Sequence, residues 1–302
     1  MFKKLARFIF YGNYFYGCCT VALAVEANIQ QNLPLNSVWF YLLLYFGTVI
    51  FYTYAYIQEK KTSYVNNRSR WYGENKNLIT STQLILIIIS AVIAIYLLIR
   101  YYAQLFEIRL IQVAALSIIG IIALAYYGIS FGSVLKFNTR NTGLFKPFVI
   151  GLVWATAVTY VPLLWYQVEN HVHYNFTQLN LWYFLKNFMY ISLLAILFDI
   201  KDYAADHNKK LKTFVVRIGI RKTIFIIIIP LTIIGFLSLL TFAFLMHFHP
   251  LRILINSIPF VLLIIVAWSM QRRKPIIYYL AVIDGLMLVK ALCGILATLL
   301  VK

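Results

Sequence analysis

The chain contains nine apolar stretches of roughly 20 residues, and these constrain its fold more than any other feature. They cover residues 8–28, 36–58, 78–99, 110–130, 147–167, 180–199, 222–246, 251–270 and 276–300. A helix of about 20 apolar residues crosses the hydrocarbon core of a bilayer. The mean hydropathy is +0.80 and 12% of the residues are charged, whereas an ordinary soluble domain is about 25% charged. We therefore expect an all-α, multi-pass membrane protein with nine transmembrane helices, forming one domain over residues 1–302.

The basic residues predict the orientation of these helices. Of the 27 lysines and arginines, 21 lie in alternate segments, within residues 3–7, 60–76, 136–146, 201–222 and 272–274. The segments on the opposite side contain Arg100, Arg109, Arg252 and Lys302. Cytoplasmic loops carry the excess of Lys and Arg, so we expect a cytoplasmic N-terminus, an external C-terminus and a bacterial cytoplasmic membrane. Because the net charge of +18 is divided among short clusters between apolar runs, we expect no nucleic-acid partner.

This topology predicts opposite accessibility for two loops. Single cysteines at Lys210 and His173, in a chain without its three native cysteines, should react with a membrane-impermeant reagent from opposite sides. Labelling of both positions from the same side would contradict the topology and the nine-helix count together.

Three of the four aspartates lie within eight residues, at the end of the sixth apolar stretch. Asp199, Asp202 and Asp206 project within an arc of about 60° on a helix. Like charges on one face repel unless a cation lies between them, and Mg²⁺ is held by one or two carboxylates together with substrate phosphate oxygens. The three aspartates therefore predict a Mg²⁺ site. The alternative is a solvated helix end with Lys201, Lys209 and Lys210 as counter-charges.

The same stretch resembles a known motif. Asp-Ile-Lys-Asp-x-x-x-Asp, then a short basic run, then Lys-Thr-x-x-Val-Arg-x-Gly, spans Asp199 to Gly219. It is similar to the second aspartate-rich motif of the UbiA-type intramembrane prenyltransferases. In that family nine helices surround a central cavity, and this motif lies on the cytoplasmic side after helix six, as it does in the predicted topology here.

The chain departs from the first aspartate-rich motif of this family, Asn-Asp-x-x-Asp, between helices two and three. The corresponding segment, residues 54–71, contains no aspartate. We expect its basic residues to contact phosphate oxygens directly and so to replace one of the two metal ions. A guanidinium can do this because it offers a phosphate two parallel hydrogen-bond donors. The alternative is that they report topology alone. The predicted diphosphate ligands are Lys60, Lys61, Arg68, Arg70, Lys201 and Arg217.

The resemblance implies transfer of a prenyl group from a prenyl diphosphate to an apolar or aromatic acceptor, such as a quinone precursor, within the membrane. Asp199, Asp202 and Asp206 are the implied catalytic residues and Mg²⁺ ligands. The missing first motif favours an alternative, a non-catalytic homologue that binds isoprenoid or other membrane lipid. A secondary transporter ranks last, because Pro147, Pro162 and Pro230 do not form a matched pair of broken helices.

Further residues are candidates by position. Carbocations are stabilised by aromatic faces, which makes Tyr126, Tyr127, Tyr190 and Tyr203 candidates, with membrane-interface packing as the alternative. Ionisable groups within apolar stretches are functional hypotheses by default. In this chain they are Glu26, Lys186, Asp284 and Lys290. For the two lysines, we expect the charged ends to reach the interface.

Overall fold

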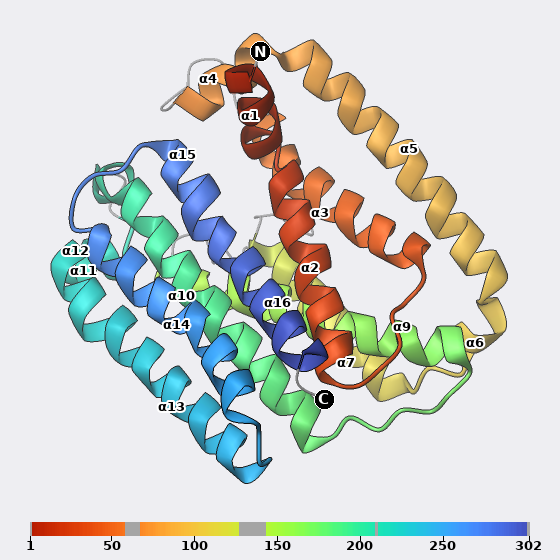
Figure 1. Ribbon diagram of the computed structural model, residues 1–302. Helices are drawn as coiled ribbons and strands as arrows, with labels where there is room; N and C mark the ends of the chain where they lie inside the picture. The colour runs from red at the N-terminus through yellow and green to blue at the C-terminus, as the bar shows by residue number, and fades with distance from the viewer. Residues whose placement is uncertain (1, 58–66, 127–142, 209–210, 301–302) are drawn as a thin grey trace.

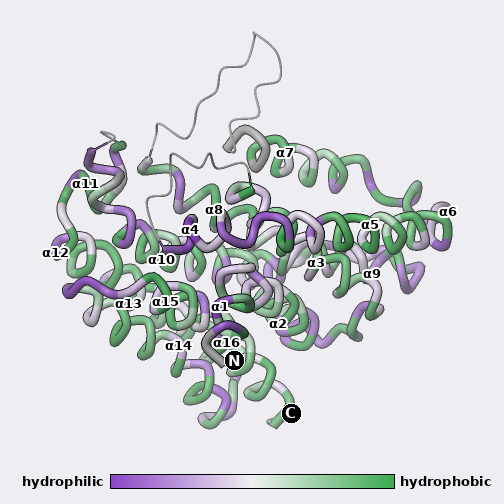
Figure 2. Tube along the Cα trace, turned by 90° about the horizontal axis from the view of Figure 1, so that it is seen from above, coloured by the Kyte–Doolittle hydropathy of each residue, from purple (hydrophilic) through white to green (hydrophobic). Residues whose placement is uncertain are grey.

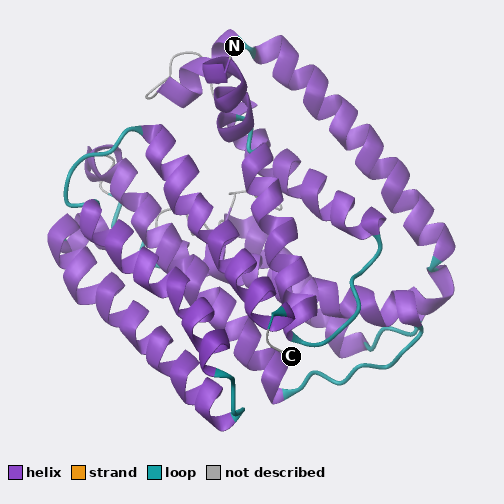
Figure 3. Ribbon diagram, in the orientation of Figure 1, coloured by secondary structure: helices purple, strands orange, loops and turns teal. Residues whose placement is uncertain are grey.

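The computed structural model describes residues 2–57, 67–126, 143–208 and 211–300. Within these ranges the chain consists of helices joined by turns and loops (Figure 3). The helices are α1 (Phe2–Tyr11), α2 (Tyr14–Gln30), α3 (Val38–Ile57), α4 (Asn67–Glu74), α5 (Lys76–Arg100), α6 (Tyr102–Phe106), α7 (Leu110–Tyr126), α8 (Lys146–Ala155), α9 (Val161–Asn170), α10 (Gln178–Asn208), α11 (Phe214–Ile218), α12 (Ile220–Lys222), α13 (Ile229–Leu245), α14 (Pro250–Ser269), α15 (Ile276–Tyr278) and α16 (Asp284–Leu299). Three π-helical segments, Thr156–Tyr160, Thr223–Ile228 and Tyr279–Ile283, join α8 to α9, α12 to α13 and α15 to α16.

Seven continuous helical segments of the described chain are long and apolar enough to cross a membrane. They begin at residues 38, 76, 146, 178, 220, 250 and 276. The bent pair α1 and α2 makes an eighth if it forms one span, and the shorter apolar helix Leu110–Ile122 lies at the predicted fourth stretch. The chain is thus an all-helical, multi-pass membrane protein. Each of the nine predicted stretches contains a helix, and the count of nine spans stays a prediction.

The first predicted stretch, 8–28, is not one straight helix. Its two parts meet at an angle of 55°, where Asn13 adopts a left-handed conformation with φ of 65°. Hydrogen bonds from α3 and α4 fix this corner, because Thr53 donates to the Gly12 carbonyl at 3.3 Å and Tyr72 donates to the Tyr11 carbonyl at 2.8 Å. Partners far along the chain decide the bend, so hydropathy alone does not reveal it.

Neighbouring helices pack in the order α13, α14, α16, α2, α3 and α5 (Figure 1). The main apolar core lies around α10, which also packs along α8. Apolar residues colour most of α5 and α7 in Figure 2, whereas α4 is hydrophilic. Much of α5 is exposed, as expected for a helix that faces lipid; its exposed side chains include Leu84, Ile85, Ile88, Val92, Ile95 and Ile99.

Two π-helical segments precede prolines inside long apolar helices. Pro162 follows the segment Thr156–Tyr160, and Pro230 follows Thr223–Ile228. Proline has no backbone N–H and crowds the preceding turn, and a π-type turn accommodates this within a helix. The third segment, Tyr279–Ile283, precedes Asp284 and contains no proline.

Glu26, Lys186 and Lys290 form a buried ionic cluster between α2, α10 and α16. Lys290 Nζ lies 2.7 Å from Glu26 Oε2, and Lys186 Nζ lies 3.4 Å from Glu26 Oε1. Lys186 also donates to Gln30 Oε1 at 2.8 Å. The expectation that both lysines reach the interface is therefore wrong. The buried carboxylate of Glu26 on α2 pairs with both lysine ammonium groups inside the bundle. Such a partner is needed because a buried charge without one is unfavourable.

Candidate functional site

A cavity of about 660 Å³ opens between the ends of several helices. This end of the bundle is the one that the basic loops predict to be cytoplasmic. The polar residues that line the cavity are Asn13, Arg68, Lys146, Asp199, Lys201, Asp202 and Asp284. Apolar and aromatic side chains complete the walls, among them Tyr16, Tyr52, Ile191, Leu194, Phe198 and Met287. The volume lies within the range of about 300–1,000 Å³ that is usual for small-molecule sites.

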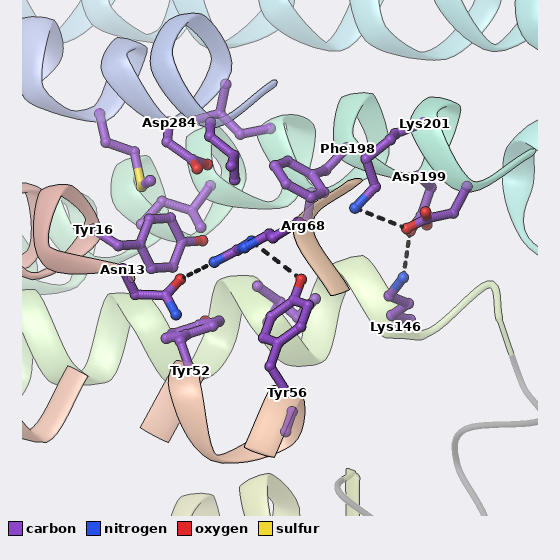
Figure 4. A pocket seen from close by; sticks show the side chains of 18 of the residues that line it. Asn13, Tyr16, Tyr52, Tyr56, Arg68, Lys146, Phe198, Asp199, Lys201 and Asp284 are labelled. Atoms are coloured by element: carbon purple, nitrogen blue, oxygen red, sulfur yellow. Dashed lines mark hydrogen bonds and ion pairs between the residues drawn. The ribbon is translucent and has the colours of Figure 1, made fainter. Parts of the chain in front are cut away.

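Asp199 and Lys146 form an ion pair at one side of the cavity (Figure 4). Asp199 is only 2% exposed, and its Oδ1 lies 2.5 Å from Lys146 Nζ. Close packing of α8 against α10 brings the two residues together. Gly151 permits this packing, because a Cβ at its position would overlap with the Ser192 side chain. The second carboxylate oxygen of Asp199 is buried and has no hydrogen-bond partner among the described residues.

Asp202 and Lys201 extend this charged side by one helical turn. Lys201 Nζ lies 3.4 Å from Asp202 Oδ2 and 4.5 Å from the ring centroid of Phe198. The Asp202 side chain is 36% exposed, so it reaches the open part of the cavity. Two lysines and two aspartates therefore alternate on the surface that a polar ligand head would contact.

Arg68 enters the cavity from α4. Its guanidinium donates to the Tyr11 carbonyl at 2.8 Å, to Asn13 Oδ1 at 2.6 Å and to the Tyr56 hydroxyl at 3.1 Å. Burial lowers the pKa of Arg68, but Tyr56, Tyr72 and Asp284 together outweigh burial, so its pKa lies above the ordinary value. Arg68 therefore keeps a fixed positive charge at the cavity and also holds the C-terminal end of α1.

The predicted site residues are divided by the structure. Arg68, Asp199, Lys201 and Asp202 line one cavity, whereas Asp206, Arg70 and Arg217 lie outside its lining. Arg70 and Arg217 are exposed on α4 and α11. Lys60 and Lys61 lie outside the described residues. Of the three aspartates on the predicted face, the first two reach the cavity and the third is a turn beyond it.

The cavity contains two of the three aspartates that were predicted to bind Mg²⁺. Across the part of the chain that the structure describes, no three or more His, Cys, Asp or Glu side chains come together as a group that could hold a metal. Asp199 and Asp202 nevertheless share the cavity, and one Asp199 oxygen is buried without a hydrogen bond. Two carboxylates suffice for Mg²⁺ when phosphate and water supply its other ligands. Magnesium binding stays a prediction.

The aromatic residues at the cavity differ from those predicted by position. Tyr16 and Tyr52 line it and contact each other edge to face, with their ring centroids 4.6 Å apart. Tyr190 is buried in the core, where its hydroxyl donates to the carbonyls of Pro259 and Leu286. Tyr203 is not among the lining residues. Tyr127 lies outside the described residues, and the Tyr126 side chain is not described.

From the sequence alone, Lys146 indicates only topology, and Asp284 is one ionisable residue in an apolar stretch. Both line the cavity. The available signal for Asp284 was its rarity, since a carboxylate inside a spanning helix marks a functional hypothesis. No comparable signal distinguished Lys146 from other lysines at helix ends, because the packing of α8 on α10 pairs it with Asp199.

Comparison with solved structures finds a fold of the same kind. A structure described as digeranylgeranylglyceryl phosphate synthase in membranes aligns with a TM-score of 0.55 and 13% sequence identity. The alignment covers 99% of this chain and 100% of that chain. No family model and no curated protein sequence matches the chain. At this identity the likeness shows the fold alone, over the whole chain.

Proposed function

We propose that this protein is an intramembrane prenyltransferase of the UbiA type, which transfers a prenyl group from a prenyl diphosphate to an acceptor. The observation that carries the proposal is the cavity itself. Within one membrane bundle it combines a charged side, made by Lys146, Asp199, Lys201 and Asp202, with apolar and aromatic walls. A prenyl diphosphate has the same division into a charged head and an apolar chain. The shared fold with a synthase described as acting in membranes supports this proposal.

In the proposed reaction, the bond between the allylic carbon and the diphosphate oxygen breaks, and the electron pair leaves with the diphosphate. Lys146 and Lys201 would donate charge-assisted hydrogen bonds to the phosphate oxygens, and Arg68 adds a fixed positive charge. Tyr16, Tyr52 and Phe198 present aromatic groups to the developing allylic cation. The surrounding apolar helices exclude water, which would otherwise capture that cation.

Asp199 and Asp202 are the residues that would hold Mg²⁺. A bound Mg²⁺ would stabilise the negative charge that develops on the leaving diphosphate. Arg68 belongs to the segment in which the UbiA resemblance implies a first aspartate-rich motif. We propose that its charge replaces part of what a second metal would provide. The Arg68 guanidinium already binds protein carbonyl and hydroxyl oxygens, so its contribution is mainly electrostatic.

A binding experiment tests this assignment without knowledge of the acceptor. Geranylgeranyl thiodiphosphate, which resists ionisation, should bind the full chain in lipid nanodiscs, and EDTA should weaken this binding. Lys146→Met and Asp199→Asn should each lower the affinity about tenfold or more, the effect of losing one charged hydrogen bond. Lys222→Met is the matched control, because Lys222 also lies in the first turn of a spanning segment but is exposed and outside the cavity lining.

The outcomes separate three cases. No binding of the thiodiphosphate by the parent would refute the prenyl diphosphate site. Equal affinity with Mg²⁺ and with EDTA would refute the magnesium assignment and leave the lysines as the diphosphate ligands. Binding without release of diphosphate from geranylgeranyl diphosphate, in nanodiscs supplied with phenolic and lipid-alcohol acceptors, would favour the non-catalytic lipid-binding alternative.

A further inference from the structure

Asp284 is a buried carboxylate that the proposed diphosphate site does not use. It is 6% exposed and lines the cavity from α16, together with Leu280 and Met287. These three residues share one side of the helix, and the π-helical segment Tyr279–Ile283 ends immediately before Asp284. A π-type turn rotates the following residues relative to a regular helix, and such turns are frequent at functional sites.

The Asp284 carboxylate has no partner among the residues that the structure describes. Its oxygens make no hydrogen bond and no ion pair with these residues, in contrast to the buried carboxylates of Glu26 and Asp199, which each pair with a lysine. Figure 4 shows the Asp284 carboxylate near Tyr16 and on the opposite side of Arg68 from Asp199. A buried carboxylate without a partner is unfavourable. A group that donates a hydrogen bond from within the cavity would remove this cost.

The charges around Asp284 indicate what kind of donor fits. Arg68 is close enough for Asp284 to contribute to its raised pKa, and Lys201 lines the same cavity. A cationic ligand would meet both of these positive charges. An uncharged hydroxyl group satisfies the carboxylate without that repulsion, and the neighbouring walls of Tyr16, Leu280 and Met287 suit an apolar body attached to it.

We propose that Asp284 binds the hydroxyl group of the acceptor and accepts its proton during prenyl transfer. This inference rests on the proposed function. The acceptor oxygen forms a bond to the allylic carbon as the bond from that carbon to diphosphate breaks, and the hydroxyl proton moves to an Asp284 oxygen. The products are the prenyl ether, diphosphate and protonated Asp284, which later releases the proton to water. Atoms and charge therefore balance without a further reactant.

The binding part can be tested on the unmodified protein. Dicyclohexylcarbodiimide reacts with accessible carboxyl groups in apolar surroundings, and peptide mass spectrometry locates the product. We expect modification of Asp284 but not of Glu26, which is ion-paired and outside the cavity lining. Hexadecan-1-ol should slow the modification of Asp284 about tenfold, as expected for a hydrogen bond to a charged group, whereas hexadecane should have little effect. No modification of Asp284, or equal protection by the two compounds, would overturn the proposal.

The catalytic part uses a matched pair of carboxylate variants. Asp284→Asn should bind geranylgeranyl thiodiphosphate as the parent does but lose about 100-fold or more in turnover with an alcohol acceptor, the scale of general base catalysis. Asp199→Asn should instead bind the thiodiphosphate about tenfold or more weakly while hexadecan-1-ol still protects Asp284. Parental turnover by Asp284→Asn would exclude its role as a base. Failure of the parent to bind the thiodiphosphate would refute the proposed function. Slower modification of Asp284 in the presence of hexadecan-1-ol would still show that Asp284 binds a hydroxyl group.

Discussion

Replacing Glu26 by alanine is expected to destabilise the protein by about 3–5 kcal/mol, the usual cost of removing one partner from a buried ionic cluster. Glu26 is 2% exposed and is the carboxylate that pairs with both Lys186 and Lys290. Without it, two lysines remain in the bundle interior with no counter-charge. The measurement is the free energy of unfolding in mixed micelles, with helix content followed by circular dichroism.

A triple variant separates the ionic explanation from simple loss of packing. Glu26→Gln, Lys186→Met and Lys290→Met together remove every charge of the cluster and keep similar volumes. Replacing a whole buried ionic set by apolar or neutral groups is often nearly neutral for stability. We therefore expect the triple variant to be much more stable than Glu26→Ala. Equal stability of the two variants would show that packing around Glu26, and not unpaired lysine charge, causes the loss.

Arg68→Ala should have the second largest effect, a loss of about 3 kcal/mol or more, because a charged residue that makes several buried hydrogen bonds is removed. Arg68 is 3% exposed. Its loss leaves the Tyr11 carbonyl and the Asn13 amide oxygen without their charged donor at the corner between α1 and α2. The affinity for prenyl thiodiphosphate should also fall, because this corner carries one wall of the cavity.

Arg70→Ala is the matched control, two residues away on the same helix. The Arg70 side chain is 66% exposed, and its contact with Glu74 spans 4.0 Å. Substitutions at such surface positions usually change stability by less than about 0.5 kcal/mol. Chemical unfolding of both variants in the same detergent makes the comparison direct. A similar loss for the two arginines would contradict a structural role specific to Arg68.

The candidate site could be predicted from the sequence only where its residues belong to one helix. Asp199 and Asp202 lie three residues apart on α10, so helical periodicity places them on one face, and the structure brings both to the cavity. Asp206 shares the predicted face but lies beyond the cavity lining. The length of the cavity along α10 decides this, and that length depends on neighbouring helices.

Arg68 shows the limit of charge patterns. The charge pattern of its segment predicts a row of phosphate ligands and does not distinguish Arg68 from Arg70. The structure buries the first and exposes the second, because Arg68 meets the carbonyl of Tyr11, 57 residues earlier in the chain. No local periodicity carries this information.

The sequence by itself determined that this chain forms membrane helices and where most of them lie, although α10 continues to Asn208 and the first stretch is bent at Asn13. Transfer of side chains from water to lipid is a nearly additive property of a local segment, so hydropathy and the placement of Lys and Arg suffice. The tertiary structure decided which intramembrane charges are neutralised and which face a ligand. Glu26 meets Lys290 across 264 residues, whereas Asp284, on the same helix as Lys290, faces the cavity without a partner in the described part of the chain. That difference arises from helix packing, because the free energy of a buried charge depends on the groups that surround it in space.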